Sequence, residues 1–107
     1  IYEVEVSEQA DRNLENFEYI AFELQSPENA IGQLNRLEEQ ILSLDAMPKR
    51  YRKYEKEPWK SRELHILPVD NYVILYIPNS DKKVVTILRV MYAGRDVDNQ
   101  LNFHTKQ

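Results

Sequence analysis

The residues best suited to chemistry lie near the end of the chain, in the run Arg89-Val90-Met91-Tyr92-Ala93-Gly94-Arg95-Asp96. An unpaired guanidinium is costly to bury, so Arg89 must lie on a solvated face, pair with an acid or bind an anion. Arginines hold phosphate through paired hydrogen bonds and stabilise the charge that builds on it during attack by a neighbouring 2′-hydroxyl. Nearby positive charge also favours the ionised phenol, which would let Tyr92 assist a proton transfer. The run is therefore a candidate site for cleaving an RNA phosphodiester.

A purely structural role is the competing interpretation of the same run. Arginine–acid pairs such as Arg95 with Asp96, or Arg89 with Asp70, would only tie down a turn. Tyr92 would then only pack against its neighbours. From the residues alone, the structural interpretation is favoured over catalysis.

Charge is distributed unevenly along the chain. Residues 1–48 hold two bases against eleven acids, whereas residues 49–107 hold twelve bases against seven acids. The bases are densest between residues 49 and 62, at Lys49, Arg50, Arg52, Lys53, Lys56, Lys60 and Arg62. Such a stretch could face a polyanion such as RNA, and Arg62 would reach the terminal site if its strand pairs nearby. Taken alone, however, a charge run is more simply explained as a solvated loop.

Composition excludes many other kinds of site. The chain has no cysteine, two histidines and two glycines, which rules out thiol chemistry, zinc ribbons, P-loops and Rossmann fingerprints. We therefore expect no metal and no organic cofactor. The longest apolar run, Tyr72 to Ile77, is six residues long, so we expect no membrane partner and a cytoplasmic location.

The first half of the chain predicts a strand and two helices. Tyr2, Val4 and Val6 alternate with glutamates, as in a strand with one buried face, and Ser7 is a candidate helix cap. Two apolar stripes at helical spacing follow, and Ser26-Pro27 separates them. Apolar residues off these stripes are candidates either for packing between the helices or for contacting a partner: Tyr19, Phe22, Ile31 and Leu42.

The second half predicts three strands, over residues 62–67, 72–77 and 84–92. Pro48 ends the helical half, and the basic stretch that follows it has no regular period. We therefore expect a single domain over residues 1–107 of class α+β, in the order strand, helix, helix, strand, strand, strand. Its twisted, antiparallel sheet would carry the helical hairpin on one face and leave the other face open for function.

These features together resemble the RelE/ParE family of type II toxin–antitoxin toxins. The resemblance rests on the element order, on Ser26-Pro27-Glu28-Asn29-Ala30, on Pro48, on Asn71-Tyr72-Val73-Ile74-Leu75-Tyr76 and on the terminal run 89–96. It implies a small α+β toxin that a cognate antitoxin holds inactive. Tyr19, Phe22, Ile31 and Leu42 then become candidate antitoxin contacts.

The resemblance leaves two mechanisms open. RelE-like toxins cut mRNA on the ribosome without a metal, which would assign phosphate binding to Arg62, Arg89 and Arg95, proton transfer to Tyr92, and ribosomal RNA contact to the basic stretch. ParE-like toxins instead block DNA gyrase and are not nucleases. The mRNA endonuclease is our first expectation and the gyrase inhibitor its alternative. Val73, where RelE-like sequences often have arginine, and the isoelectric point near 5.2 count against the nuclease.

Overall fold

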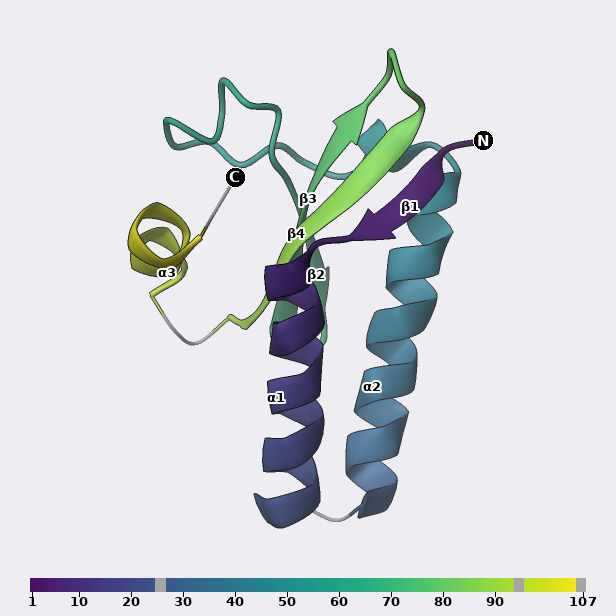
Figure 1. Ribbon diagram of the computed structural model, residues 1–107, viewed down its shortest axis with the longest axis vertical. Coiled ribbons are helices and arrows are strands. Elements are labelled where there is room, and N and C mark those ends of the chain that lie inside the picture. The colour runs from purple at the N-terminus through teal and green to yellow at the C-terminus, as the bar shows by residue number, and fades with distance from the viewer. Residues whose placement is uncertain (25–26, 94–95, 106–107) are drawn as a thin grey trace.

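The computed structural model describes residues 1–24, 27–93 and 96–105, without the side chains of residues 17–24, 27, 30 and 104. Its elements are β1 (Glu3–Val6), α1 (Glu8–Leu24), α2 (Pro27–Leu42), the short 3₁₀ turns η1 (Ser43–Asp45) and η2 (Pro48–Arg50), β2 (His65–Val69), β3 (Tyr72–Asn79), β4 (Val84–Tyr92) and α3 (Val97–His104) (Figure 1). The class α+β is confirmed. Within the described residues, the sequence patterns did not predict the helix α3 or the short turns η1 and η2.

The four strands form one sheet in the order β1-β4-β3-β2. β3 pairs antiparallel with both β2 and β4, as expected for consecutive strands joined by turns. β1 pairs parallel to β4, with Glu3 opposite Val84 and Val6 opposite Ile87. The sheet is therefore mixed rather than wholly antiparallel, because the chain passes through two helices before the last strand returns beside the first.

The helical hairpin is confirmed and covers one face of the sheet. Ser7 begins α1 as predicted, since its hydroxyl accepts a hydrogen bond from the Ala10 amide at 3.0 Å. Figure 1 shows α1 and α2 side by side and extending beyond the sheet. The buried cluster beneath them contains Ala10, Leu37, Ile41, Leu44, Leu67, Val69, Ile74, Tyr76, Val85, Ile87 and Val90. Where their side chains are described, the apolar stripes that predicted the helices supply this cluster, with Ala10 from the first stripe and Leu37, Ile41 and Leu44 from the second. The first-stripe residues Phe17, Ala21 and Leu24 lie outside the described side chains.

The opposite face of the sheet is also covered, which corrects the expectation of an open functional face. A second buried cluster there contains Trp59, Leu64, Ile66, Val73, Leu75, Leu88, Met91 and Leu101. Trp59 comes from the basic stretch and Leu101 from α3. The indole Nε1 of Trp59 donates to Asn102 Oδ1 at 2.9 Å, which joins these two covering segments to each other.

The basic stretch runs along the outer edge of β2 before turning into it. The Ile66 amide donates to the Arg52 carbonyl at 3.0 Å, and the Tyr54 amide donates to the Leu64 carbonyl at 2.8 Å. These bonds satisfy part of an edge that would otherwise be unpaired. The predicted start of this strand at Arg62 is wrong: residues 60–63 form a turn, in which Glu63 is left-handed with φ 64°.

Candidate functional site

Arg89 lies where β4 continues beyond the end of β1. β1 pairs with β4 only as far as Ile87, so the next backbone groups of β4 need other partners. Two side chains supply them. The Ser7 hydroxyl donates to the Leu88 carbonyl at 2.9 Å, and Asn13 Oδ1 accepts from the Val90 amide at 3.2 Å. The start of α1 therefore completes the edge of the sheet beside Arg89.

The Arg89 side chain is held within this arrangement. Its Nε donates to the same Asn13 Oδ1 at 2.8 Å, and its Nη1 donates to Thr105 Oγ1 at 2.8 Å. Thr105 in turn donates to the Gln100 carbonyl at 3.0 Å. Arg89 is only 7% exposed, and burial lowers the pKa of its guanidinium from the ordinary value. Arg89 thus joins α1, β4 and the segment after α3.

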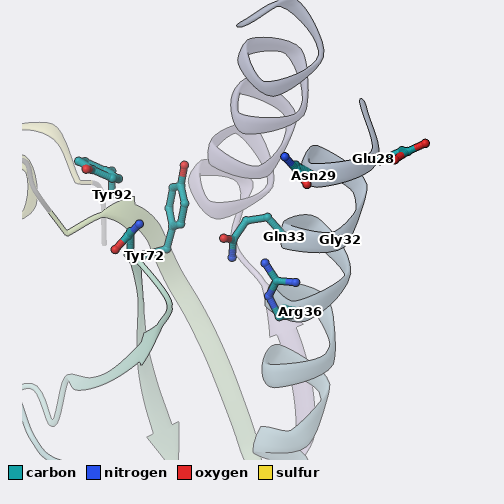
Figure 2. Close-up of a pocket in the computed structure, with 8 residues that line it drawn as sticks. Glu28, Asn29, Gly32, Gln33, Arg36, Tyr72 and Tyr92 are labelled. Carbon is teal, nitrogen blue, oxygen red and sulfur yellow. The ribbon is translucent and has the colours of Figure 1, made fainter. Parts of the chain in front are cut away.

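Tyr92 lies at the end of β4 in a different environment. It is 46% exposed and stands opposite Tyr72 of β3, with ring centroids 5.6 Å apart and planes at 71°. The two tyrosines form one wall of a groove of about 450 Å³ between the sheet and the first half of α2 (Figure 2). The groove is lined by Glu28, Asn29, Gly32, Gln33, Arg36, Asn71, Tyr72 and Tyr92. Arg89 does not line it, so the structure separates these two members of the terminal run.

Among the described residues that line this groove, the cation is Arg36, which the sequence patterns did not single out. Its Nε donates to Asp70 Oδ2 at 2.7 Å, and the Gln33 amide donates to the same oxygen at 3.0 Å. These bonds hold the pKa of Asp70 below its ordinary value. Asp70 therefore pairs with Arg36 and not with Arg89. Gln33 and Arg36 are three residues apart on one helix face, so both side chains can reach the same carboxylate. That spacing predicts a shared polar face of the helix but does not identify Asp70 as its partner.

Arg62 lies apart from both sites. It is in the turn before β2, with its guanidinium carbon 5.0 Å from the centre of the Trp59 ring. Arg95 lies outside the described residues. Among the described residues of the predicted RNA-cleavage set, Arg62, Arg89 and Tyr92 thus occupy three separate environments, and the predicted role of the set remains a prediction.

Half of the cations predicted to contact RNA have local partners. Arg50 donates to the Ala46 carbonyl and lies 4.7 Å from the centre of the Tyr51 ring. Lys53 pairs with Glu63 at 2.7 Å, and Lys56 pairs with Asp98. The other three are exposed and form no salt bridge with a described residue: Lys49, Arg52 and Lys60.

The candidate antitoxin contacts fall in two groups. Ile31 and Leu42 of α2 are 48% and 67% exposed, and their spacing of three helical turns places them on one face. The side chains of Tyr19 and Phe22 lie outside the described residues. Leu42 is thus mostly solvated and Ile31 about half covered, and their role as antitoxin contacts stays a prediction.

The described residues contain neither a metal-binding cluster nor a membrane-spanning helix. Within the described ranges, no group of three histidine, aspartate or glutamate side chains is placed to bind a metal ion. Over the same ranges, every helix is too short or too polar to cross a bilayer.

Comparison with known proteins identifies the class. The family model of the ParE toxin of type II toxin–antitoxin systems (parDE) matches residues 4–97. The chain therefore belongs to this family, and it is the toxin component of a type II toxin–antitoxin system. Among curated proteins, no sequence matches it.

Solved structures share its fold. The chromosomal ParDE system from P. aeruginosa aligns with TM-score 0.71 and 16% identity, covering 85% of this chain and 95% of that chain. The RelBE2 toxin–antitoxin complex from Mycobacterium tuberculosis aligns with TM-score 0.63 and 22% identity, covering 85% of this chain and 96% of that chain. The intact RelBE toxin–antitoxin complex from E. coli aligns with TM-score 0.62 and 15% identity, covering 89% of this chain and 100% of that chain. At these identities the likeness concerns the fold alone.

Proposed function

We propose that this toxin acts by binding a protein target, as ParE-like toxins do when they block DNA gyrase, and does not cut mRNA. The supporting observation is the environment of Arg89. A metal-independent nuclease must stabilise the charge that develops on phosphate, and several converging cations would provide that stabilisation. Arg89 is buried and bonded to Asn13 and Thr105, so it serves the fold.

The surroundings of Tyr92 support the same choice. Its aromatic neighbour is Tyr72, and Arg36, the cation among the described residues that line its groove, is paired with Asp70. The described part of the groove therefore offers phosphate no unpaired cation beside Tyr92. The net charge of -4 also weakens any attraction to ribosomal RNA.

The RelE-like mRNA endonuclease is the second candidate. It is supported by the exposure of Tyr92 and by the three cations Lys49, Arg52 and Lys60, which form no salt bridge with a described residue. In that mechanism Tyr92 assists proton transfer, while Arg62 and Arg95 contact phosphate.

Pulse labelling after induction of the toxin separates the two candidates. We expect DNA synthesis to stop before protein synthesis, mRNA to stay intact, and purified toxin to inhibit supercoiling by gyrase. Tyr92→Phe keeps the ring and removes the hydroxyl, so it should remain toxic. Early arrest of translation with cleaved mRNA, abolished by Tyr92→Phe in a folded protein, would contradict gyrase inhibition and establish the nuclease.

We also propose that a cognate antitoxin neutralises this toxin and contacts the exposed face of α2. Ile31 and Leu42 would provide apolar contacts there. Leu42→Lys should weaken antitoxin binding without loss of fold, because the side chain is already solvated. The control is Asn35→Lys, because it places the same charge at an exposed position of the same helix. Leu37→Lys is unsuitable because Leu37 is buried. Equal antitoxin affinity for the native protein and Leu42→Lys would remove Leu42 from the contact.

A further inference from the structure

Met47 differs from the other exposed apolar residues in its backbone conformation. It has φ 49° and ψ 55°, in the left-handed region, and its side chain is 75% exposed. Glycine or asparagine adopts this conformation with less strain than a residue with a long side chain. A large apolar side chain is thus kept in water at a position where a smaller residue would suit the fold better.

The loop around Met47 is fastened in place. The Arg50 amide donates to the Met47 carbonyl at 3.1 Å, and the Arg50 guanidinium donates to the carbonyls of Ala46 and Met47. Pro48 is buried, and its carbonyl accepts a hydrogen bond from the Tyr76 hydroxyl at 2.6 Å. Burial raises the pKa of that phenol, so it stays a donor. The framework therefore presents Met47 from a fixed position.

A hollow of about 370 Å³ lies beside Met47. It is lined by Tyr2, Met47, Pro48, Lys49 and Arg50, which we call the Met47 patch. The Lys83 ammonium is not part of the lining but lies 5.1 Å from the centre of the ring of Tyr2, which is part of it. None of the lining residues is acidic. The patch thus combines an apolar floor with a cationic rim on a protein of negative net charge.

We propose that the Met47 patch docks an acidic segment of the cognate antitoxin, with one apolar side chain seated against Met47 and Tyr2. Methionine adapts its shape to an apolar partner, and a buried apolar anchor commonly carries much of the energy of an interface. Carboxylates beside that anchor would face Lys49, Arg50 and Lys83. The proposal rests on the proposed antitoxin partnership but not on whether the target is gyrase or mRNA.

The test compares Met47→Gly with Phe103→Ala, using the full toxin and its purified antitoxin in isothermal titration calorimetry. Phe103 is a matched control because it is 76% exposed and lies outside the patch. Met47→Gly should keep or raise the thermal midpoint, because glycine suits the left-handed backbone. It should raise the Kd for the antitoxin at least about tenfold, whereas Phe103→Ala should leave the Kd unchanged. If Met47→Gly does not fold, Met47→Asn gives the same comparison, since asparagine also tolerates this conformation.

A charge variant tests the rim separately. Lys49→Glu with Lys83→Glu should weaken binding at low salt and reduce its dependence on salt. The proposal is overturned if folded Met47→Gly binds the antitoxin with native affinity. If that variant also loses toxicity, the patch contacts the cellular target instead. Failure of the native toxin to bind its antitoxin would instead refute the proposed partnership.

Discussion

Asn13 and Arg89, which are 76 positions apart in sequence, share a hydrogen bond of 2.8 Å that fastens α1 to the free edge of β4. The same Asn13 oxygen also accepts from the Val90 amide at 3.2 Å. One amide side chain thus replaces the strand that would otherwise pair there. It also keeps a buried guanidinium bonded within the fold, which explains how an arginine can lie inside an apolar strand.

Replacing Asn13 by alanine should therefore destabilise the protein. The Arg89 Nε and the Val90 amide both lose the Asn13 oxygen as their acceptor. A buried donor left unsatisfied lowers the free energy of unfolding by about 1–3 kcal/mol. The free energy of unfolding from urea denaturation measures the loss. Asn35→Ala is the control, because Asn35 is exposed on α2 and should change stability by less than about 0.5 kcal/mol. Equal stabilities of the two variants would show that the Asn13 bonds contribute nothing.

Arg89→Met should separate a structural role of Arg89 from a chemical one. Methionine fills similar space and leaves the Asn13–Val90 bond in place, but it removes the hydrogen bonds to Asn13 and Thr105. We expect a loss of about 1–3 kcal/mol and toxicity that persists wherever the variant is folded. Circular dichroism and growth arrest at a permissive temperature measure the two effects. A folded variant without toxicity would show that Arg89 acts directly on the target.

Local patterns were enough to predict most of the fold. Pro27 begins α2, and residues 84–92 form β4, because apolar periodicity and turn residues are properties of neighbouring positions. α3 was missed because only Val97 and Leu101 show its buried side, which is too little for a helical pattern. The parallel pairing of β1 with β4 likewise depends on the path of the whole chain.

The candidate site was harder to predict because it, too, depends on contacts between residues far apart in the sequence. The residue types in the terminal run were visible, but the partners of Arg89 come from α1 and from the segment after α3. The sequence alone allows Asp70 as a partner for Arg89, yet Asp70 pairs with Arg36, 34 positions away. Side-chain pairing across such separations follows from tertiary packing, which spacing along one chain does not encode.

The Arg36–Asp70 pair should make stability depend on pH in acid. Hydrogen bonds from Arg36 and then Gln33 lower the pKa of Asp70 below 3.8 in the folded protein. The stabilisation that the Asp70 carboxylate contributes is therefore complete at a pH above its ordinary pKa. This stabilisation is lost as the pH falls through the lowered pKa of the folded protein. Asp70→Asn should show a smaller fall in melting temperature between about pH 5 and pH 2 than the native protein.

The control for this acid dependence is Asp81→Asn. Asp81 is an exposed acid that forms no salt bridge with a described residue, so its removal should leave the acid dependence close to native. Because Asp70 is itself exposed to solvent, the expected difference is small and should shrink further in high salt. Identical curves for native protein and Asp70→Asn at low salt would mean that the pair does not stabilise the fold.

Leu101→Ala should release α3 from the face of the sheet that it covers. Leu101 is fully buried against the second cluster, and truncating such a leucine costs about 2–5 kcal/mol. Since Asn102 of α3 accepts the Trp59 indole hydrogen bond, release should expose this single tryptophan and shift its fluorescence to longer wavelength. Phe103→Ala removes an exposed side chain of the same helix and should change neither the emission nor the stability. If Leu101→Ala lowers stability while Trp59 emission stays native, α3 remains docked and its contact with the sheet does not depend on Leu101.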